Sequence, residues 1–442
     1  MNSNLYGSNS INKILLKIAP PVMLAQLIQA LYNIMDSFFI GKYNQDSLTA
    51  LSIVYPLQLL MIAIAVGSGV GINTRMAYAL GVGDEQKSKD YAGIGIILAI
   101  ILWFLFALIS FIIMPFFARM STSSEEVIND VVIYGRIVCV GSIGIFLESI
   151  WSKILQANGD MKTPMIDQIV GAVINIILDR ILIFGIGGFK GMGLAGAAVA
   201  TVIGQIISSL IVLKKGVYKP PKASIFKTYL KNVYISGFPN ILMQSAYTFY
   251  ILGLNLILSE FSDQAVTALG LYYKWQTIFF IPLGALQTCI VPVVSYNYAS
   301  KDYRRCNKTL YLSILYGVML MAIGTLCFET IPAQMLRVFT KDEEVIKIGA
   351  YGFHFIGVSF IPMVTSLIFP VFFQAIGYSI RSSILTIVRT SVLFVPLGYL
   401  FSRFGLDYFW LTFICTETIT SIIGFIFYLK YLKNNNLRLK DC

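Results

Sequence analysis

The sequence predicts an all-α integral membrane protein with twelve transmembrane helices, arranged as two six-helix lobes that are parallel repeats of each other. Three observations support this prediction: the composition, the recurrence of apolar runs of about twenty residues, and a repeat between the two halves of the chain. Hydrophobic residues make up 57% of the 442 residues and charged residues only 12%, whereas about a quarter of an ordinary soluble domain is charged. Strand-like alternation of apolar and polar residues is absent, so the spans are helices rather than a barrel.

Apolar runs between short polar breaks mark the twelve expected spans. They lie at 15–40, 51–80, 91–118, 127–155, 164–186, 192–213, 233–259, 265–298, 308–330, 345–375, 382–402 and 408–432. The longest break, at 214–232, contains six lysines. It divides the chain into an expected N-lobe at 1–213 with helices one to six, a cytoplasmic basic linker at 214–232, and a C-lobe at 233–442 with helices seven to twelve.

An internal repeat relates the two halves. The segment LTALSIVYP at 48–56 aligns with VTALGLYYK at 266–274, a shift of 218 residues, and the same shift places Pro21 on Pro239. One offset kept over so long a stretch indicates duplicated lobes. Each lobe has an even number of spans, so both begin on the same side of the membrane and the repeats are parallel. A cleft between two such lobes is the expected substrate site, and rocking of the lobes would expose it to each side in turn.

The distribution of lysine and arginine predicts the orientation. When the breaks alternate between the two sides of the membrane, the side with both termini has 21 of these residues and the other side has 7. The positive-inside rule therefore puts both termini in the cytoplasm. The net charge of +11 is thus a topology signal, with some attraction to anionic membrane lipid, and does not indicate binding of nucleic acid.

Two carboxylates in the first half fall inside predicted spans, where each costs about 2.5–3.5 kcal/mol on the insertion scale. Asp36 follows Asn33 by three residues and Asp179 follows Asn175 by four, so each acid shares a helix face with an amide. Both acids lie five or six residues before the glycine that follows their span, and hence at similar depth. The two acids and two amides are candidate hard oxygen ligands for a cation, or one carboxyl holds a proton.

A threonine in the sixth span, Thr201, could add a hydroxyl to this set, although a threonine in a helix often bonds its own backbone. Structural alternatives exist for the acids too. Asp36 could snorkel to the interface, and Asp179 could pair with Arg180 or cap the helix end. The residue types alone leave these alternatives open.

The second half lacks this acidic pair and has other charged or titratable residues in apolar settings. Glu417, which lies deep in its span, could neutralise a cationic substrate, carry a proton or pair with Arg389. Lys274, His354 and Arg389 complete a candidate set of substrate-cavity residues. His354 is equally well explained as an ordinary packed histidine.

Catalytic and cofactor chemistry finds no support in the sequence. A single histidine and six cysteines without CxxC spacing do not make a zinc or haem site. No GxxxxGK[ST] phosphate-binding loop is present, and no nucleophile marks an active site. We therefore expect neither enzyme activity nor a cofactor. Aromatic residues, at 14%, suit a cavity for flat cations as well as ordinary membrane packing.

The chain resembles the multidrug and toxic compound extrusion (MATE) family, in particular its bacterial MepA-like multidrug branch. The resemblance rests on Pro21 and Asp36 in the first span, QANGDMKTPM at 156–165, NIILDRILIFG at 175–185 and GAAVAT at 196–201, and it covers nearly the whole chain. It implies a MATE-like fold in the bacterial cell (inner) membrane. It also implies export of amphipathic, often cationic drugs or toxic compounds in exchange for inward H⁺ or Na⁺.

The same resemblance implies roles for individual residues. It assigns the cation-coupling site, where Na⁺ would be the metal, to Asp36, Asn175, Asp179 and Thr201. It also implies that Pro21 occupies the position at which the first helix of some members bends. Arg180 departs from the pattern, since the family usually has a proline after the second acid, and its charge would weaken the ion affinity of Asp179.

A flippase for a lipid-linked oligosaccharide or another lipid is the competing function, because such proteins share the superfamily fold. Their cavity is typically rich in arginine to hold pyrophosphate, whereas the central basic residues here are few, Lys274 and Arg389. A channel or a receptor is disfavoured by the two repeated lobes and the buried acids. We expect a monomer that takes small amphipathic cations and contacts membrane lipid. Composition does not separate H⁺ from Na⁺ coupling.

Overall fold

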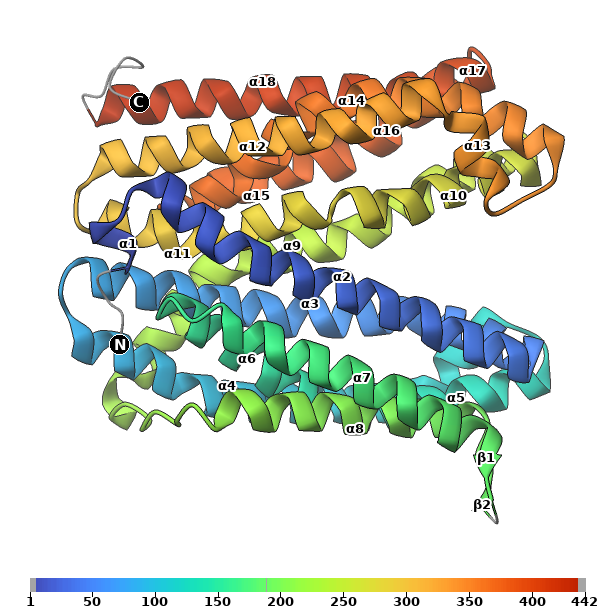
Figure 1. Ribbon diagram of the computed structural model, residues 1–442, viewed down its shortest axis with the longest axis horizontal. Coiled ribbons are helices and arrows are strands. Elements are labelled where there is room, and N and C mark those ends of the chain that lie inside the picture. Colours follow the sequence, from blue (N-terminus) through green and yellow to red (C-terminus); the bar gives the residue numbers. More distant parts are fainter. Residues whose placement is uncertain (1–4, 188, 436–442) are drawn as a thin grey trace. The chain divides into compact units, whose positions relative to one another are not determined.

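The computed structural model describes residues 5–187 and 189–435, and nearly all of them are helical (Figure 1). The helices of the first half are α1 (Leu5–Ser8), α2 (Ile11–Tyr43), α3 (Gln45–Gly81), α4 (Glu85–Ser121), α5 (Glu125–Val140), α6 (Ile143–Ala157), α7 (Lys162–Phe184) and α8 (Leu194–Leu213). A short antiparallel hairpin of β1 (Gly185–Ile186) and β2 (Phe189–Lys190) joins α7 to α8, and Figure 1 shows it extending past the end of α7.

The second half has the same helical character. Its helices are α9 (Ala223–Ser259), α10 (Asp263–Phe279), α11 (Ile281–Ala299), α12 (Tyr303–Thr330), α13 (Pro332–Arg337), α14 (Glu343–Ala375), α15 (Ser379–Ile387), the π-helix η1 (Val388–Phe394), α16 (Val395–Ser402), α17 (Leu406–Phe409) and α18 (Leu411–Asn434). Since α15, η1 and α16 follow one another without a gap, they form one continuous span.

Among the described residues, nine helices are long and apolar enough to cross a membrane, and two bent helix pairs raise the number to eleven. The pairs are α5–α6, bent by 43°, and α10–α11, bent by 52°. The twelfth expected span is α7, which has 23 residues. It is less apolar than the others because it carries Lys162, Asp167, Asp179 and Arg180. Each expected span thus corresponds to a helix or a run of helices, which confirms the predicted fold class.

The helix bounds repeat with the 218-residue offset found in the sequence. Helix α3 covers 45–81 and the α10–α11 pair covers 263–299, while α5–α6 covers 125–157 and α14 covers 343–375. The helix caps repeat as well: Asp84 accepts from the backbone N–H of Lys87 over 2.9 Å, and Asp302 accepts from that of Arg305 over 3.1 Å. The halves differ in where they bend, because α3 and α14 run without a break at the places where their counterparts are bent.

The chain divides into two compact units, the first at Pro20–Ile241 and the second at Tyr6–Ala19 together with the residues from Leu242 on. The borders lie inside α2 and α9, three residues before the second of them standing Pro239. The segment expected as a linker at 214–232 is helical from Ala223 on. The first part of α9 therefore belongs to the first unit.

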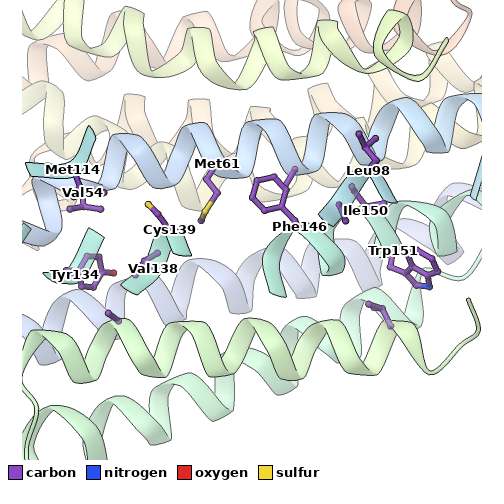
Figure 2. Close-up of a cluster of buried hydrophobic side chains, with 14 of the residues drawn as sticks. Val54, Met61, Leu98, Met114, Tyr134, Val138, Cys139, Phe146, Ile150 and Trp151 are labelled. Carbon is purple, nitrogen blue, oxygen red and sulfur yellow. The ribbon is translucent and has the colours of Figure 1, made fainter. Parts of the chain in front are cut away.

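Within the first unit, α3 to α6 enclose a buried apolar core. Met61 of α3, Cys139 of α5 and Phe146 of α6 belong to it (Figure 2). At its edge, the indole N–H of Trp151 donates to the carbonyl oxygen of Gly216 over 3.1 Å. Lipid tails are as apolar as these side chains, so close packing rather than removal from water holds such a core together.

The proline pair of α2 lies inside the helix. Helix α2 begins at Ile11, so Pro20 and Pro21 lie in its third turn rather than in its first, where proline would be tolerated without cost. A proline inside a helix removes one backbone hydrogen bond and crowds the carbonyl four residues before it. The pair therefore marks a weak point in the hydrogen bonding of α2.

Candidate functional site

The first unit contains a polar pocket of roughly 570 Å³ that opens to its surroundings. Four helices supply its walls: α2, α6, α7 and α8. Its polar lining is provided by Gln29, Tyr32, Glu148, Gln168, Asn175, Thr201, Gln205 and Ser208. A pocket with so many amides, hydroxyls and a carboxylate, inside a helix bundle that spans a membrane, is a candidate ion pathway.

The helices α7 and α8 approach closely because glycines face each other where they pack. A Cβ atom added at Gly204 would lie 2.9 Å from the carbonyl oxygen of Gly171, and one added at Gly171 would lie 2.0 Å from Ser208 Oγ. Small residues of this kind let helix backbones approach in a membrane. This close contact brings Asn175 of α7 next to Thr201 of α8.

Three of the predicted site residues form one hydrogen-bonded group. In the amide orientation that satisfies both neighbours, Asn175 Nδ2 donates to Asp179 Oδ2 over 3.2 Å and its oxygen accepts the Thr201 backbone N–H over 3.2 Å. The Asn175 amide also lies 3.4 Å from Thr201 Oγ1. Asp179 is fully buried, at 0% exposure, and its Oδ1 has no hydrogen-bond partner among the described residues.

Asp36 of α2 joins this group through its charge. Its carboxylate interacts electrostatically with that of Asp179, and both acids interact with the hydroxyl of Tyr32. Asp36 is buried, at 8% exposure, and its Oδ1 also lacks a hydrogen-bond partner within the described ranges. Two buried carboxylates, each with an unsatisfied oxygen, are costly unless a cation or a proton compensates them.

The donor set fits such a cation. Carboxylate, amide and hydroxyl oxygens are the ligands that hard cations prefer. In the part of the chain that the structure describes, no three His, Cys, Asp or Glu residues gather as a transition-metal site would require. The site is thus suited to a proton or a hard monovalent ion held by two acids, one amide and one hydroxyl.

Two details of the prediction around this site differ from the structure. Asn33 is exposed and does not line the pocket, and its carbonyl oxygen accepts from Ser37 Oγ over 3.1 Å. The residues of α2 that do line it are Gln29 and Tyr32. Their spacing of three and four residues from each other and from Asp36 places all three on one helix face, a signal that could have identified them from the sequence.

Arg180 does not pair with Asp179. Its guanidinium lies over the ring of Phe184, 5.5 Å from the ring centre, while Asp179 points to Asn175. Successive residues of a helix point about 100° apart, so neighbouring side chains of opposite charge need not meet. Asp179 is therefore held by α8 rather than by its own neighbour.

The candidate residues of the second unit do not form one site. Glu417 of α18 accepts hydrogen bonds from Arg389 of η1 and from Ser366 of α14, and it is fully buried. His354 instead contacts Glu329, with 2.8 Å between Nδ1 and Oε2. Lys274 is exposed and its ammonium lies 5.1 Å from the ring centre of Phe339. Glu417 and Arg389 thus come together, whereas Lys274 and His354 have partners of their own.

Comparison with known proteins is consistent with this architecture. The MatE family model matches the chain twice, at residues 21–181 and 239–400, and the two matches begin 218 residues apart (239 − 21 = 218), the offset of the internal repeat. An FAD transporter of Shewanella oneidensis is 24% identical over 404 residues, 89% of this chain and 88% of that protein. The multidrug export protein MepA of Staphylococcus saprophyticus is 23% identical over 432 residues, 95% of this chain and 94% of that protein.

A solved structure of a MOP superfamily transporter from Pyrococcus furiosus has the same fold, with a TM-score of 0.91, 22% identity and coverage of 99% of both chains. The two family matches together cover more than half of the chain. Members of the family are transporters rather than enzymes. The chain is therefore a multi-pass membrane protein that belongs to the MatE family of transporters.

Proposed function

We propose that this protein is a secondary active antiporter that exports amphipathic, often cationic compounds in exchange for inward H⁺ or Na⁺. The observation that supports this most is the group formed by Asp36, Asn175, Asp179 and Thr201. Its two buried acids have one unsatisfied oxygen each, which is what a reversible cation site requires. The name of one relative, a multidrug export protein, agrees with the substrate class.

The two acids couple the ion to transport through their mutual repulsion. When Asp36 and Asp179 both lack a cation, two negative charges interact in a poorly hydrated site. Binding of a proton or Na⁺ removes that repulsion and allows α2 to pack against α7. Alternating access follows if the two arrangements differ in the side of the membrane to which the substrate cleft opens. In this scheme both termini lie in the cytoplasm.

Charge at the pocket favours a cationic rather than an anionic substrate. The acid of its lining is Glu148, and no lysine or arginine lines it among the described residues. An arginine-rich cavity would be expected for a lipid-linked pyrophosphate. Because one relative is named an FAD transporter, the substrate test includes FAD as its anionic arm.

The test uses proteoliposomes that contain the full-length protein, with the proton gradient and the Na⁺ gradient imposed separately. We expect export of a fluorescent lipophilic cation driven by one of the gradients, and little transport of FAD. Asp36→Asn abolishes the gradient-driven component, because an amide keeps the shape of the side chain but cannot take up or release charge. Asn33→Ala, on the same helix but outside the pocket, serves as the matched control and keeps wild-type export.

Two results would contradict the proposal. Gradient-driven export by Asp36→Asn at the wild-type rate, at equal protein levels, would remove the coupling role of the acid. FAD transport faster than transport of the cation would overturn the substrate class while leaving the coupling site in place.

A further inference from the structure

A second acid in α7 is buried without a compensating group. Asp167 has 0% exposure, and neither of its carboxylate oxygens has a hydrogen-bond donor among the described residues. No lysine or arginine forms an ion pair with it in the described ranges. A fully buried, unpaired carboxylate is not stable in its charged form. Asp167 must therefore hold a proton or share a cation.

The group that faces Asp167 is another acid. The carboxyls of Asp167 and Glu148 are in hydrogen-bonding contact, and such a contact between two carboxyls requires a proton on one of them. Glu148 accepts from Ser152 Oγ over 2.9 Å and from Ser149 Oγ over 3.2 Å. These hydroxyls fix its position on α6, so the two acids are held together by their helices.

Glu148 connects this pair to the polar pocket, because it lines the pocket while Asp167 lies behind it. Within the pocket, Gln168 Oε1 and Gln205 Oε1 are buried atoms without a hydrogen-bond partner among the described residues. Asn175 and Thr201 line the same pocket. A continuous series of polar groups thus runs from the Glu148–Asp167 pair to the coupling site.

The two acidic pairs lie at opposite ends of α7. Asp167 is the sixth residue of the helix and Asp179 is the sixth from its end, a separation of about 18 Å along the axis. Residues 167, 171, 175 and 179 recur at four-residue intervals and form one ridge of the helix. In the expected orientation the Asp167 end faces the cytoplasm.

We propose that Glu148 and Asp167 form a second proton site of the first unit, at the cytoplasmic end of the pocket, which exchanges its shared proton with the Asp36–Asp179 site. This inference rests on the proposed cation-coupled transport. The proton that leaves the inner pair is taken by Glu148 through the pocket and replaces the one that Asp167 shares with it. An antiporter with two proton sites in series releases its proton to the cytoplasm without opening the coupling site to that side.

Other titratable groups near the pair belong to three helices. Tyr32 of α2 interacts electrostatically with Glu148, and Asp179 lies further along α7. Lys153 lies five residues after Glu148 on α6, and its ammonium donates to Gln156 Oε1 over 3.1 Å. The polar groups of α8 at the pocket are the neutral side chains of Thr201, Gln205 and Ser208. The pair therefore titrates in an environment with two further acids of the same unit and one lysine.

Infrared difference spectroscopy of the purified full-length protein tests the site directly, because a protonated carboxyl has its own C=O band and this band shifts in D₂O when the proton exchanges. We expect the wild type to show an exchangeable carboxyl band that is lost in both Asp167→Asn and Glu148→Gln. Glu126→Gln, which changes an exposed acid of α5, keeps the band. If Asp167→Asn does not fold, Glu148→Gln carries the test, since its side chain is only partly buried.

A second measurement separates proton transfer from a structural role. In proteoliposomes, Glu148→Gln should slow proton-driven export severalfold while leaving the affinity for the fluorescent cation unchanged. A carboxyl band that persists in both variants, or that does not exchange in D₂O, would overturn the proposal. The band is measured without transport, so its presence stands even if Asp36→Asn exports normally and the proposed coupling function fails.

Discussion

The guanidinium of Arg389 holds Glu417 by both carboxylate oxygens, with Nη2 2.6 Å from Oε1 and Nε 3.0 Å from Oε2. Glu417 is fully buried and Arg389 is 6% exposed. The ring of Phe394, 5.1 Å from the guanidinium carbon, and that of Tyr250, at 5.8 Å, cover the arginine. Because η1 is a π-helix, it turns Arg389 to a position that an uninterrupted α-helix would give to a neighbouring residue.

Removal of one partner of this pair should destabilise the protein more than removal of both. Glu417→Gln leaves a buried guanidinium without its counter-charge, at a cost of about 3–5 kcal/mol. We expect a large fall in the thermal unfolding temperature in detergent, and partial recovery in the double variant Glu417→Gln/Arg389→Gln. Strictly additive losses would show that the two side chains do not depend on each other.

The His354–Glu329 pair supplies the control for this measurement. It has the same kind of contact, at 2.8 Å, but its side chains are 46% and 35% exposed. An exposed pair contributes about 0–1 kcal/mol. His354→Ala should therefore leave the unfolding temperature nearly unchanged.

The contact between α7 and α8 predicts the effect of a single methyl group. In Gly204→Ala the new Cβ would lie 2.9 Å from the carbonyl oxygen of Gly171 and 3.3 Å from Asn175 Cβ. Since backbone cannot yield as a side chain can, α8 must move away, at a cost of about 1–3 kcal/mol. We expect lower thermal stability and slower gradient-driven export, because Thr201 moves away from Asn175. Gly270→Ala, where no atom lies within 4 Å of the new Cβ, should be neutral or slightly stabilising.

Arg305 anchors the first residues of the chain within the second unit. Its Nη2 donates to the carbonyl oxygens of Tyr6 and Asn9 over 2.6 and 2.8 Å, and its Nε donates to Asn297 Oδ1 over 2.7 Å. Arg305→Ala should raise the rate of amide hydrogen exchange in residues 6–19, and Arg305→Lys should not restore protection, because one ammonium cannot reach all three acceptors. The exposed neighbour Arg304 provides the control: Arg304→Ala should exchange like the wild type.

Pro21 predicts an effect on motion rather than on fold. The border between the two units crosses α2 at Pro20, and the missing backbone hydrogen bond makes bending there easier. Pro21→Ala should give an inserted, more stable protein that exports severalfold more slowly and with altered ion dependence in proteoliposomes. Pro282→Ala, at the first turn of α11, should change neither property. Unchanged export by Pro21→Ala would remove the hinge.

The sequence by itself determined the features that depend on local composition and periodicity. Apolar runs predicted every span, because a segment in lipid must satisfy its own backbone hydrogen bonds and is therefore a helix. The offset of 218 residues predicted the paired helix bounds. Asp36, Asn175 and Asp179 stand out because an acid or an amide inside an apolar run has no other explanation as simple as function.

The tertiary structure alone decided which polar groups meet. Asp167 occurs near a helix end, where an acid is unremarkable, and only the packing of α6 on α7 shows that it faces Glu148. The bends of α5–α6 and α10–α11, and the turn of Arg389 towards Glu417, depend on the neighbours of each helix. Periodicity tells which residues share a face, but the face that meets a pocket is chosen by contacts between residues far apart in the chain.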